Sequence, residues 1–139
     1  MIDFVLDSSV TFSWFFDDER SDAADLLLDR LETGSAAVPA LWYFEVANVL
    51  AVRERQKRST AAQTAAFVAQ LADLAIVSDD DTPAIALIRI LNLARSERLT
   101  GYDAAYLELA MRLGVPLATK DKALGRAAKR LGVLVVGAD

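Results

Sequence analysis

The sequence of 139 residues contains no cysteine and no histidine. Without cysteine, the chain has no disulfide framework, no thiol nucleophile and no thiolate ligand for a metal. Without histidine, it lacks the ligand of most zinc sites and the side chain that most often serves as a general base. Any metal ion must therefore be held by oxygen atoms, which favours Mg²⁺ or Mn²⁺, with Ca²⁺ less favoured.

A positively charged leader and long hydrophobic runs are also missing. The first ten residues, MIDFVLDSSV, have an acid at position 3 and no basic residue, unlike a signal peptide. The longest apolar run, AIALIRILNLA, is interrupted by Arg89, so we expect no membrane-spanning segment. We therefore expect one cytoplasmic domain over residues 1–139. Its net charge of −5 counts against nucleic-acid binding, unless a local patch or a bound metal reverses the sign.

Short apolar runs alternate with helical patterns along the chain, without a repeat or a linker. We expect strands over 3–7, 36–39, 75–78, 115–119 and 133–136. We expect helices over 8–16, 21–34, 40–58, 59–74, 82–98, 99–114 and 122–132. Apolar strands alternating with helices predict an α/β fold, with a central parallel sheet of about five strands and helices on both faces. In such sheets, ligands bind beyond the carboxyl ends of the strands.

Two acidic residues follow expected strands. Asp7 ends the first strand, and Asp121 follows the strand over 115–119, so both are expected at carboxyl ends. Each also precedes an expected helix, where an acid acts as an N-cap. The sequence leaves both explanations open.

Glu45 lies in the segment LWYFEVANVL, where only Glu45 and Asn48 are neither apolar nor aromatic. We expect this half of the helix to be buried on all sides. An unpaired buried carboxylate is costly, so Glu45 needs compensation, either from a buried salt bridge or from a metal. Asn48 lies one turn further on, and we expect it to support Glu45.

Asp103 lies near the start of the expected helix LTGYDAAYLELAMRLG. A helical wheel places it on the apolar side, beside Tyr106 and roughly opposite a narrow stripe that is expected to face water. That stripe consists of Gly101, Ala104, Glu108 and Arg112. Thr100 and Asp103 also have nearly the spacing of a capping box, which gives Asp103 a purely structural explanation.

All four acids are expected at one edge of the sheet, because helix N-termini lie at the same edge as the carboxyl ends of parallel strands. Carboxylates gathered in an apolar pocket repel one another and raise one another's pKa values. A divalent cation removes this conflict. The four positions together therefore predict a hard-metal site.

The segments FVLDSSV, WYFEVANVL, LTGYDAAYLELA and LATKD, in this order, resemble the acidic signature of PIN-domain ribonucleases. The chain is most similar to the VapC-type toxins of bacterial and archaeal toxin–antitoxin pairs, over essentially its whole length. The resemblance implies a three-layer PIN-like fold and a Mg²⁺- or Mn²⁺-dependent endoribonuclease. It implies that the metal-binding and catalytic acids are Asp7, Glu45, Asp103 and Asp121. Thr119 and Ser9 match the polar residues beside these acids, and we expect Thr119 to help position water.

The resemblance also implies three partners: an RNA substrate, a protein antitoxin and a second copy of the chain in a homodimer. For the antitoxin we assign the aromatic run Phe12, Trp14, Phe15 and Phe16, with core packing as the alternative. For RNA, the candidates are Arg53, Arg55, Lys57 and Arg58, with a solvated helix end as the alternative. Lys120 and Lys122 flank Asp121, where they bind phosphate or simply lie in solvent.

Two other functional classes are consistent with acids at strand ends. A phospho-acceptor receiver domain also binds Mg²⁺ there, but it places an acidic pair after the first strand, where LDSSV has one acid. The other alternative is a catalytically inactive binding module that keeps the PIN fold.

Overall fold

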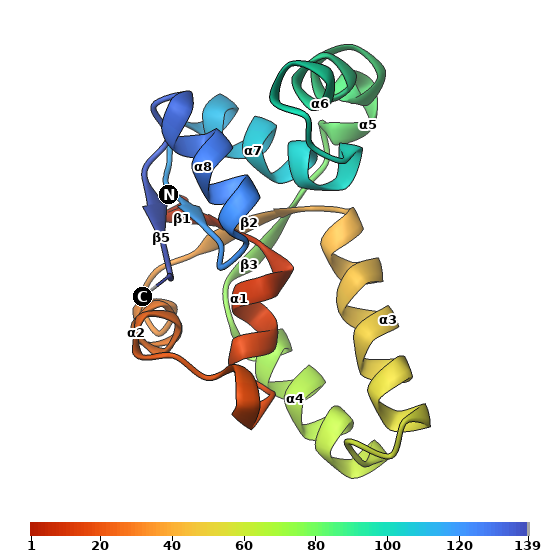
Figure 1. Cartoon of the computed structure of the whole chain (residues 1–139). Helices are drawn as coiled ribbons and strands as arrows, with labels where there is room; N and C mark the ends of the chain where they lie inside the picture. Colours follow the sequence, from red (N-terminus) through yellow and green to blue (C-terminus); the bar gives the residue numbers. More distant parts are fainter. Residues whose placement is uncertain (139) are drawn as a thin grey trace.

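The computed structural model describes residues 1–138, apart from the side chains of residues 82 and 83. At its centre is a five-stranded parallel sheet with the strand order β3-β2-β1-β4-β5. The strands are β1 (Phe4–Leu6), β2 (Ala36–Pro39), β3 (Ile76–Asp79), β4 (Leu117–Ala118) and β5 (Val135–Val136). Helices cover both faces of the sheet (Figure 1), which confirms the predicted α/β architecture.

Helices connect all consecutive strands. The regular helices are α1 (Ser8–Ser13), α2 (Asp22–Arg30), α3 (Leu41–Arg55), α4 (Ala61–Asp73), α7 (Gly101–Leu113) and α8 (Lys122–Arg130), and the 3-10 helix η1 (Asp17–Glu19) precedes α2. The expected helix over 82–98 is interrupted, because a π-helical turn, η2 (Ala86–Ile90), separates α5 (Thr82–Ile85) from α6 (Leu91–Glu97). In Figure 1, α3 and α4 form a hairpin that extends away from the sheet.

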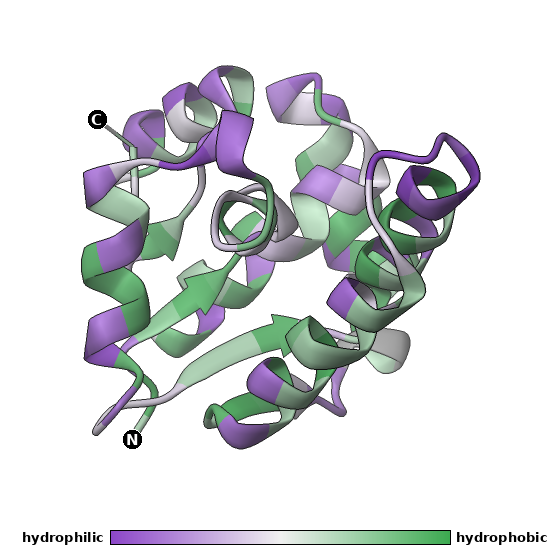
Figure 2. Ribbon diagram, turned by 90° about the horizontal axis from the view of Figure 1, so that it is seen from below, coloured by the Kyte–Doolittle hydropathy of each residue, from purple (hydrophilic) through white to green (hydrophobic). Residues whose placement is uncertain are grey.

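The central strands and α7 form the main core. Val5 and Leu6 of β1 and Tyr106 and Leu107 of α7 are completely buried. Figure 2 shows hydrophobic residues along the strands and on the helix faces turned toward them. In the described part of the chain, no helix is both long enough and apolar enough to cross a membrane.

The stripe of α7 that was expected to face water is exposed only at Gly101, so the expectation is wrong for Ala104, Glu108 and Arg112. Ala104 is fully buried and Glu108 is 7% exposed, because η2 and α6 pack across this face of the helix. The guanidinium of Arg112 binds Glu108 and also Asp79 at the end of β3. The charged residues of the stripe therefore form a mostly buried ion-pair network.

The expectation that the first half of α3 is buried on all sides is also wrong. Trp42, Val46 and Leu50 pack into the core, but Phe44 is 75% exposed and Tyr43 is 45% exposed. The hairpin of α3 and α4 extends beyond the sheet, so nothing in the described chain covers this side of the helix (Figure 1). The result is an exposed apolar surface.

Candidate metal centre

The strand order reverses between β1 and β4, which are neighbours in the sheet although they are far apart in the sequence. Such a topological switch point leaves a crevice beyond the carboxyl ends of the two strands, where α/β proteins bind their ligands. Asp7 directly follows β1, and Thr119 directly follows β4. The two residues therefore meet at this crevice.

Asp7 is the buried centre of the site, with 5% exposure. It occupies the N-cap position of α1, but its side chain makes no capping hydrogen bond, so the capping explanation is wrong. Instead, its Oδ2 atom accepts hydrogen bonds from Ser9 Oγ and Thr119 Oγ1, each at 2.7 Å. These hydroxyls in turn accept bonds from the backbone N–H groups of Lys120 and Asp121. The loop after β4 is thus built around the Asp7 carboxylate.

Glu45 accepts a hydrogen bond from the hydroxyl of Tyr106. Among the described residues, no cation forms an ion pair with Glu45, so the buried salt bridge considered from the sequence is not present. Asn48 is exposed and makes no hydrogen bond to Glu45 in the described chain. Tyr106 was not predicted as a site residue, although its position three residues after Asp103 places both side chains on one face of α7.

Asp103 and Asp121 both lie at helix N-termini, with different roles there. The backbone N–H of Asp103 donates to Thr100 Oγ1 at 3.1 Å, and the reciprocal bond of a capping box is not present. The carboxylate of Asp103 is therefore not the cap of α7. The carboxylate of Asp121 does cap α8, because its Oδ1 atom accepts from the backbone N–H of Leu124 at 2.9 Å.

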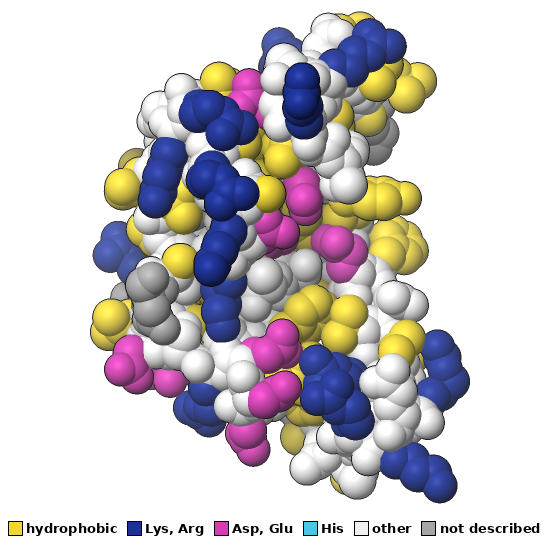
Figure 3. All heavy atoms as spheres, in the orientation of Figure 1, with side chains coloured by type: hydrophobic (Ala, Val, Ile, Leu, Met, Phe, Trp, Pro, Cys, Tyr) yellow, Lys and Arg dark blue, Asp and Glu magenta, His cyan; other side chains and the backbone are white. Residues whose placement is uncertain are grey.

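The four carboxylates lie within electrostatic reach of one another. Burial raises the pKa of Asp7, and the charge of Asp121 raises it further, against the hydrogen bonds from the two hydroxyls. Burial also raises the pKa of Glu45, with further increases from the charges of Asp7 and Asp103. Burial, followed by the charges of Asp121 and Asp7, raises the pKa of Asp103 to about 6. Figure 3 shows acidic side chains gathered in a hollow of this face.

The donor set of the site fits a hard divalent cation. All candidate ligands are carboxylate or hydroxyl oxygens, and the carboxylates destabilise one another when they are charged. In residues 1–138, no three acidic side chains are grouped closely enough to hold a metal ion by themselves. Mg²⁺ typically takes only one or two carboxylates, and water and substrate phosphate complete its shell. The residues therefore suit an ion that is shared with the substrate.

The residues assigned to partner surfaces make mostly internal contacts. Phe16 is 6% exposed, Phe15 stacks on Phe67 with ring centroids 4.6 Å apart, and the Trp14 indole N–H donates to the Ala24 carbonyl. Phe12 packs against the same core. At the end of α3, Arg53 pairs with Glu19 and Arg58 pairs with Asp18, whereas Arg55 and Lys57 are exposed.

The model of the PIN domain family matches residues 4–130, so the chain belongs to the PIN domain family. Among solved structures, the chain is similar to one described as the crystal structure of PAE2754 from Pyrobaculum aerophilum. The TM-score is 0.70 with 23% sequence identity, and the match covers 96% of this chain and 83% of that chain. This likeness supports the fold alone. None of the curated proteins matches the chain.

The raised pKa of Asp103 predicts that the metal-free protein loses stability as the pH rises. Its pKa is about 6 in the folded protein and about 3.9 in an unfolded chain. Folding therefore favours the protonated form, and the free energy of unfolding falls between about pH 4 and about pH 6 and stays low above this range.

In EDTA, we expect Asp103→Asn to stabilise the protein by roughly 1 kcal/mol at about pH 7.5, with little effect at about pH 4. This stabilisation is well below the free energy that corresponds to the full pKa shift, because solvent screens the half-exposed side chain. Urea unfolding of both proteins at the two pH values measures the difference. Equal stabilisation by Asp103→Asn at both pH values would contradict the electrostatic explanation.

Proposed function

We propose that this protein is a metal-dependent endoribonuclease and the toxin of a type II toxin–antitoxin pair, acting in the cytoplasm. PIN domains are generally nucleases, and the family match covers residues 4–130. The observation that supports this function most directly is the buried Asp7 at the switch point, in electrostatic contact with three further acids. The family match favours a nuclease over the receiver-domain alternative.

In the proposed reaction, Asp7, Glu45 and Asp103 would share Mg²⁺ or Mn²⁺ with water and the substrate phosphate, while Thr119 and Asp121 would orient the attacking water. When bound, the ion supplies positive charge to the scissile phosphate and makes a nearby water more acidic. The water oxygen attacks phosphorus, and a carboxylate of the cluster accepts the water's proton, because the chain has no histidine. The P–O3′ bond breaks and the leaving O3′ takes a proton from solvent, which leaves 5′-phosphate and 3′-hydroxyl ends.

Tyr106 has a positioning role in this proposal. Its hydroxyl donates to Glu45. Burial, followed by the hydrogen bond to Glu45 and the charges of Glu45 and Asp7, raises the pKa of Tyr106, so the phenol stays protonated. It therefore acts as a fixed donor that orients the Glu45 carboxylate. Ser9 has the corresponding role toward Asp7.

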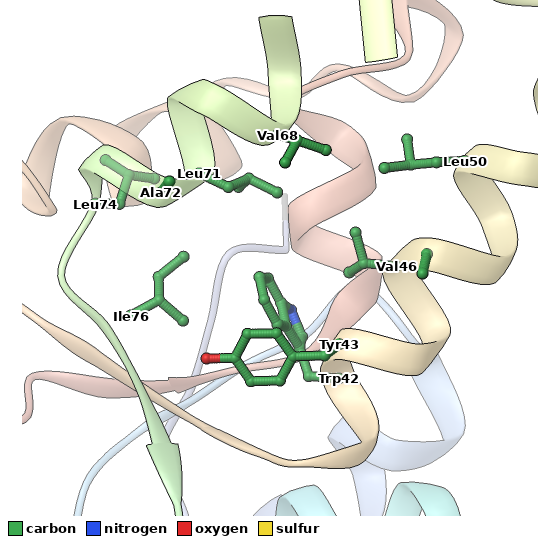
Figure 4. A pocket seen from close by; sticks show the side chains of 10 residues that line it. Trp42, Tyr43, Val46, Leu50, Val68, Leu71, Ala72, Leu74 and Ile76 are labelled. Atoms are coloured by element: carbon green, nitrogen blue, oxygen red, sulfur yellow. The ribbon is translucent and has the colours of Figure 1, made fainter. Parts of the chain in front are cut away.

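The antitoxin is the proposed protein partner, and the chain has an apolar surface suited to its tail. A groove of about 340 Å³ lies between α3 and α4. Figure 4 shows its lining side chains, which include Trp42, Tyr43, Val46, Leu50, Val68, Leu71, Leu74 and Ile76. Because α3 also contains Glu45, we propose that the bound segment continues from this groove to the acid cluster, where an arginine of the segment would replace the metal's positive charge. The role of the aromatic run 12–16 and the homodimer stay predictions.

Cleavage of an unstructured RNA by the purified protein tests this function. We expect cleavage in Mg²⁺ or Mn²⁺, none in EDTA, and recovery when the metal is restored. Products that are substrates for a 5′-phosphate-dependent exonuclease identify the bond that is broken. A folded protein that cleaves no RNA with either metal would favour the inactive binding module.

A further inference from the structure

All charged residues of α8 are cations, and all of them are exposed. The helix KALGRAAKR has no acidic residue, and its i, i+4 and i+7 positions are Lys122, Arg126 and Lys129. This spacing aligns the three side chains along one side of the helix over about 10 Å. All three are exposed. The opposite side consists of the buried residues Leu124, Gly125, Ala127 and Ala128.

Helix stability explains only part of this arrangement, because the helix dipole favours Lys129 and Arg130 in the last turn. Lys122 is the first residue of α8, where the positive end of the helix dipole disfavours a cation. The i, i+4 pairs Lys122–Arg126 and Arg126–Arg130 bring like charges together, which destabilises a helix. In the described chain, Arg130 pairs with Glu97, whereas Lys122, Arg126 and Lys129 form no ion pair. Their charges are therefore available to an external anion.

A groove of about 410 Å³ runs beside these cations and leads to the acid cluster. Its lining includes the three cations of α8, Val135 of β5 and, toward the cluster, Thr119 and Asp121. Figure 3 shows a row of Lys and Arg side chains over the position of α8, next to acidic side chains in the hollow. A ligand that follows the row therefore reaches the metal centre.

Gly125 also lines this groove. It is buried in the middle of α8, where glycine is less stable than alanine. A Cβ atom added there would meet Val135 Cγ1 at 3.8 Å, which is ordinary contact, so packing does not require a glycine. A longer side chain at this position would narrow the groove.

We propose that this groove binds the sugar–phosphate backbone of a single-stranded nucleic acid, through Lys122, Arg126 and Lys129, on one side of the cleavage position. The inference rests on the proposed function, because it brings the substrate to the nuclease site. A groove of about 410 Å³ is in the size range of small-ligand sites, which suits a short stretch of one strand. The cations offset the repulsion between a polyanion and a protein of net charge −5. Phosphate contacts set affinity and direction, not the cleavage sequence.

Fluorescence anisotropy with a labelled, unstructured RNA in EDTA measures binding without cleavage, over a series of salt concentrations. We expect the triple variant Lys122→Gln, Arg126→Gln, Lys129→Gln to weaken binding at least about tenfold at low salt. The slope of log affinity against log salt should become shallower by about 2, since each lost single-strand phosphate contact removes ~0.7. The matched control Arg89→Gln, Arg95→Gln, Arg98→Gln removes the same charge from exposed residues of the α5–α6 segment, and it should keep both affinity and slope.

Wild-type affinity and slope in the α8 variant, with its fold verified by circular dichroism, would overturn the inference. Equal losses in the two triple variants would also overturn it, since they would reflect bulk charge. The inference would also be overturned if a third triple variant, at the end of α3, lost more RNA affinity than the α8 variant. Its substitutions are Arg55→Gln, Lys57→Gln and Arg58→Gln. If the wild type cleaves RNA but the α8 variant binds normally, only the binding groove is wrong. If the wild type neither binds nor cleaves RNA, the proposed function itself fails.

Discussion

Asp103→Asn is expected to reduce RNA cleavage by at least about a hundredfold, as loss of one group that stabilises developing charge in an active site does. The variant should remain folded, because the capping bond to Thr100 comes from the backbone N–H of residue 103. Asparagine also removes the charge that its neighbours disfavour in the metal-free protein. Initial cleavage rates in Mn²⁺, together with a melting curve in EDTA, separate lost chemistry from lost folding.

Asp73→Asn is the matched control for this substitution. Asp73 is an exposed acid at the end of α4, outside the cluster, and the change in charge and shape is the same. We expect the control to cleave at the wild-type rate. If Asp103→Asn cleaved as fast as the control, Asp103 would have no part in the reaction.

Arg112→Ala is expected to destabilise the protein by about 3 kcal/mol, the cost of removing one partner from a buried ion pair. The side chains of Glu108 and Asp79 are 8% and 10% exposed, and Arg112 binds both carboxylates with its guanidinium. These bonds raise the pKa of Arg112, first through Asp79 and then through Glu108. Without Arg112, two mostly buried carboxylates lose the charge between them. For a chain of this length, the melting temperature should fall by about 10 °C.

Arg130→Ala removes a single surface ion pair and serves as the control. Arg130 is 56% exposed and binds only Glu97 among the described residues, so its loss should cost no more than about 1 kcal/mol. Thermal unfolding of both variants measures the contrast. Equal losses of stability in the two variants would mean that the network around Arg112 stabilises the protein no more than a surface ion pair does.

The elements and their order could be predicted because their signals are local. The spacing of Thr60 and Gln63 predicts a capping box, and both bonds of that box are present at the start of α4. Thr100 and Gly114 likewise predict the ends of α7, where Gly114 adopts the left-handed conformation. Alternation of apolar strands with helices was sufficient to predict the parallel sheet, whose edge then brings the four acids together.

Contacts between distant segments could not be predicted in the same way. A helical wheel places Glu108 and Arg112 on one side of α7, but it does not reveal that η2 and α6 cover that side. Similarly, the apolar composition of α3 gave no sign that Phe44 lies in solvent. The hydroxyl of Thr119 reaches Asp7 across 112 residues of sequence, and the hydroxyl of Tyr106 reaches Glu45 across 61. Only the fold brings such partners together.

The central claim is that the acid cluster binds a divalent cation, and calorimetric titration with Mn²⁺ tests it most directly. We expect the wild type and Asp73→Asn to bind Mn²⁺ with equal affinity, and Asp7→Asn and Asp103→Asn to bind it at least about tenfold more weakly. The titration needs no RNA, so it is independent of substrate and partner. Equal Mn²⁺ affinity in all four proteins, or no binding by the wild type, would contradict a metal centre built from these carboxylates.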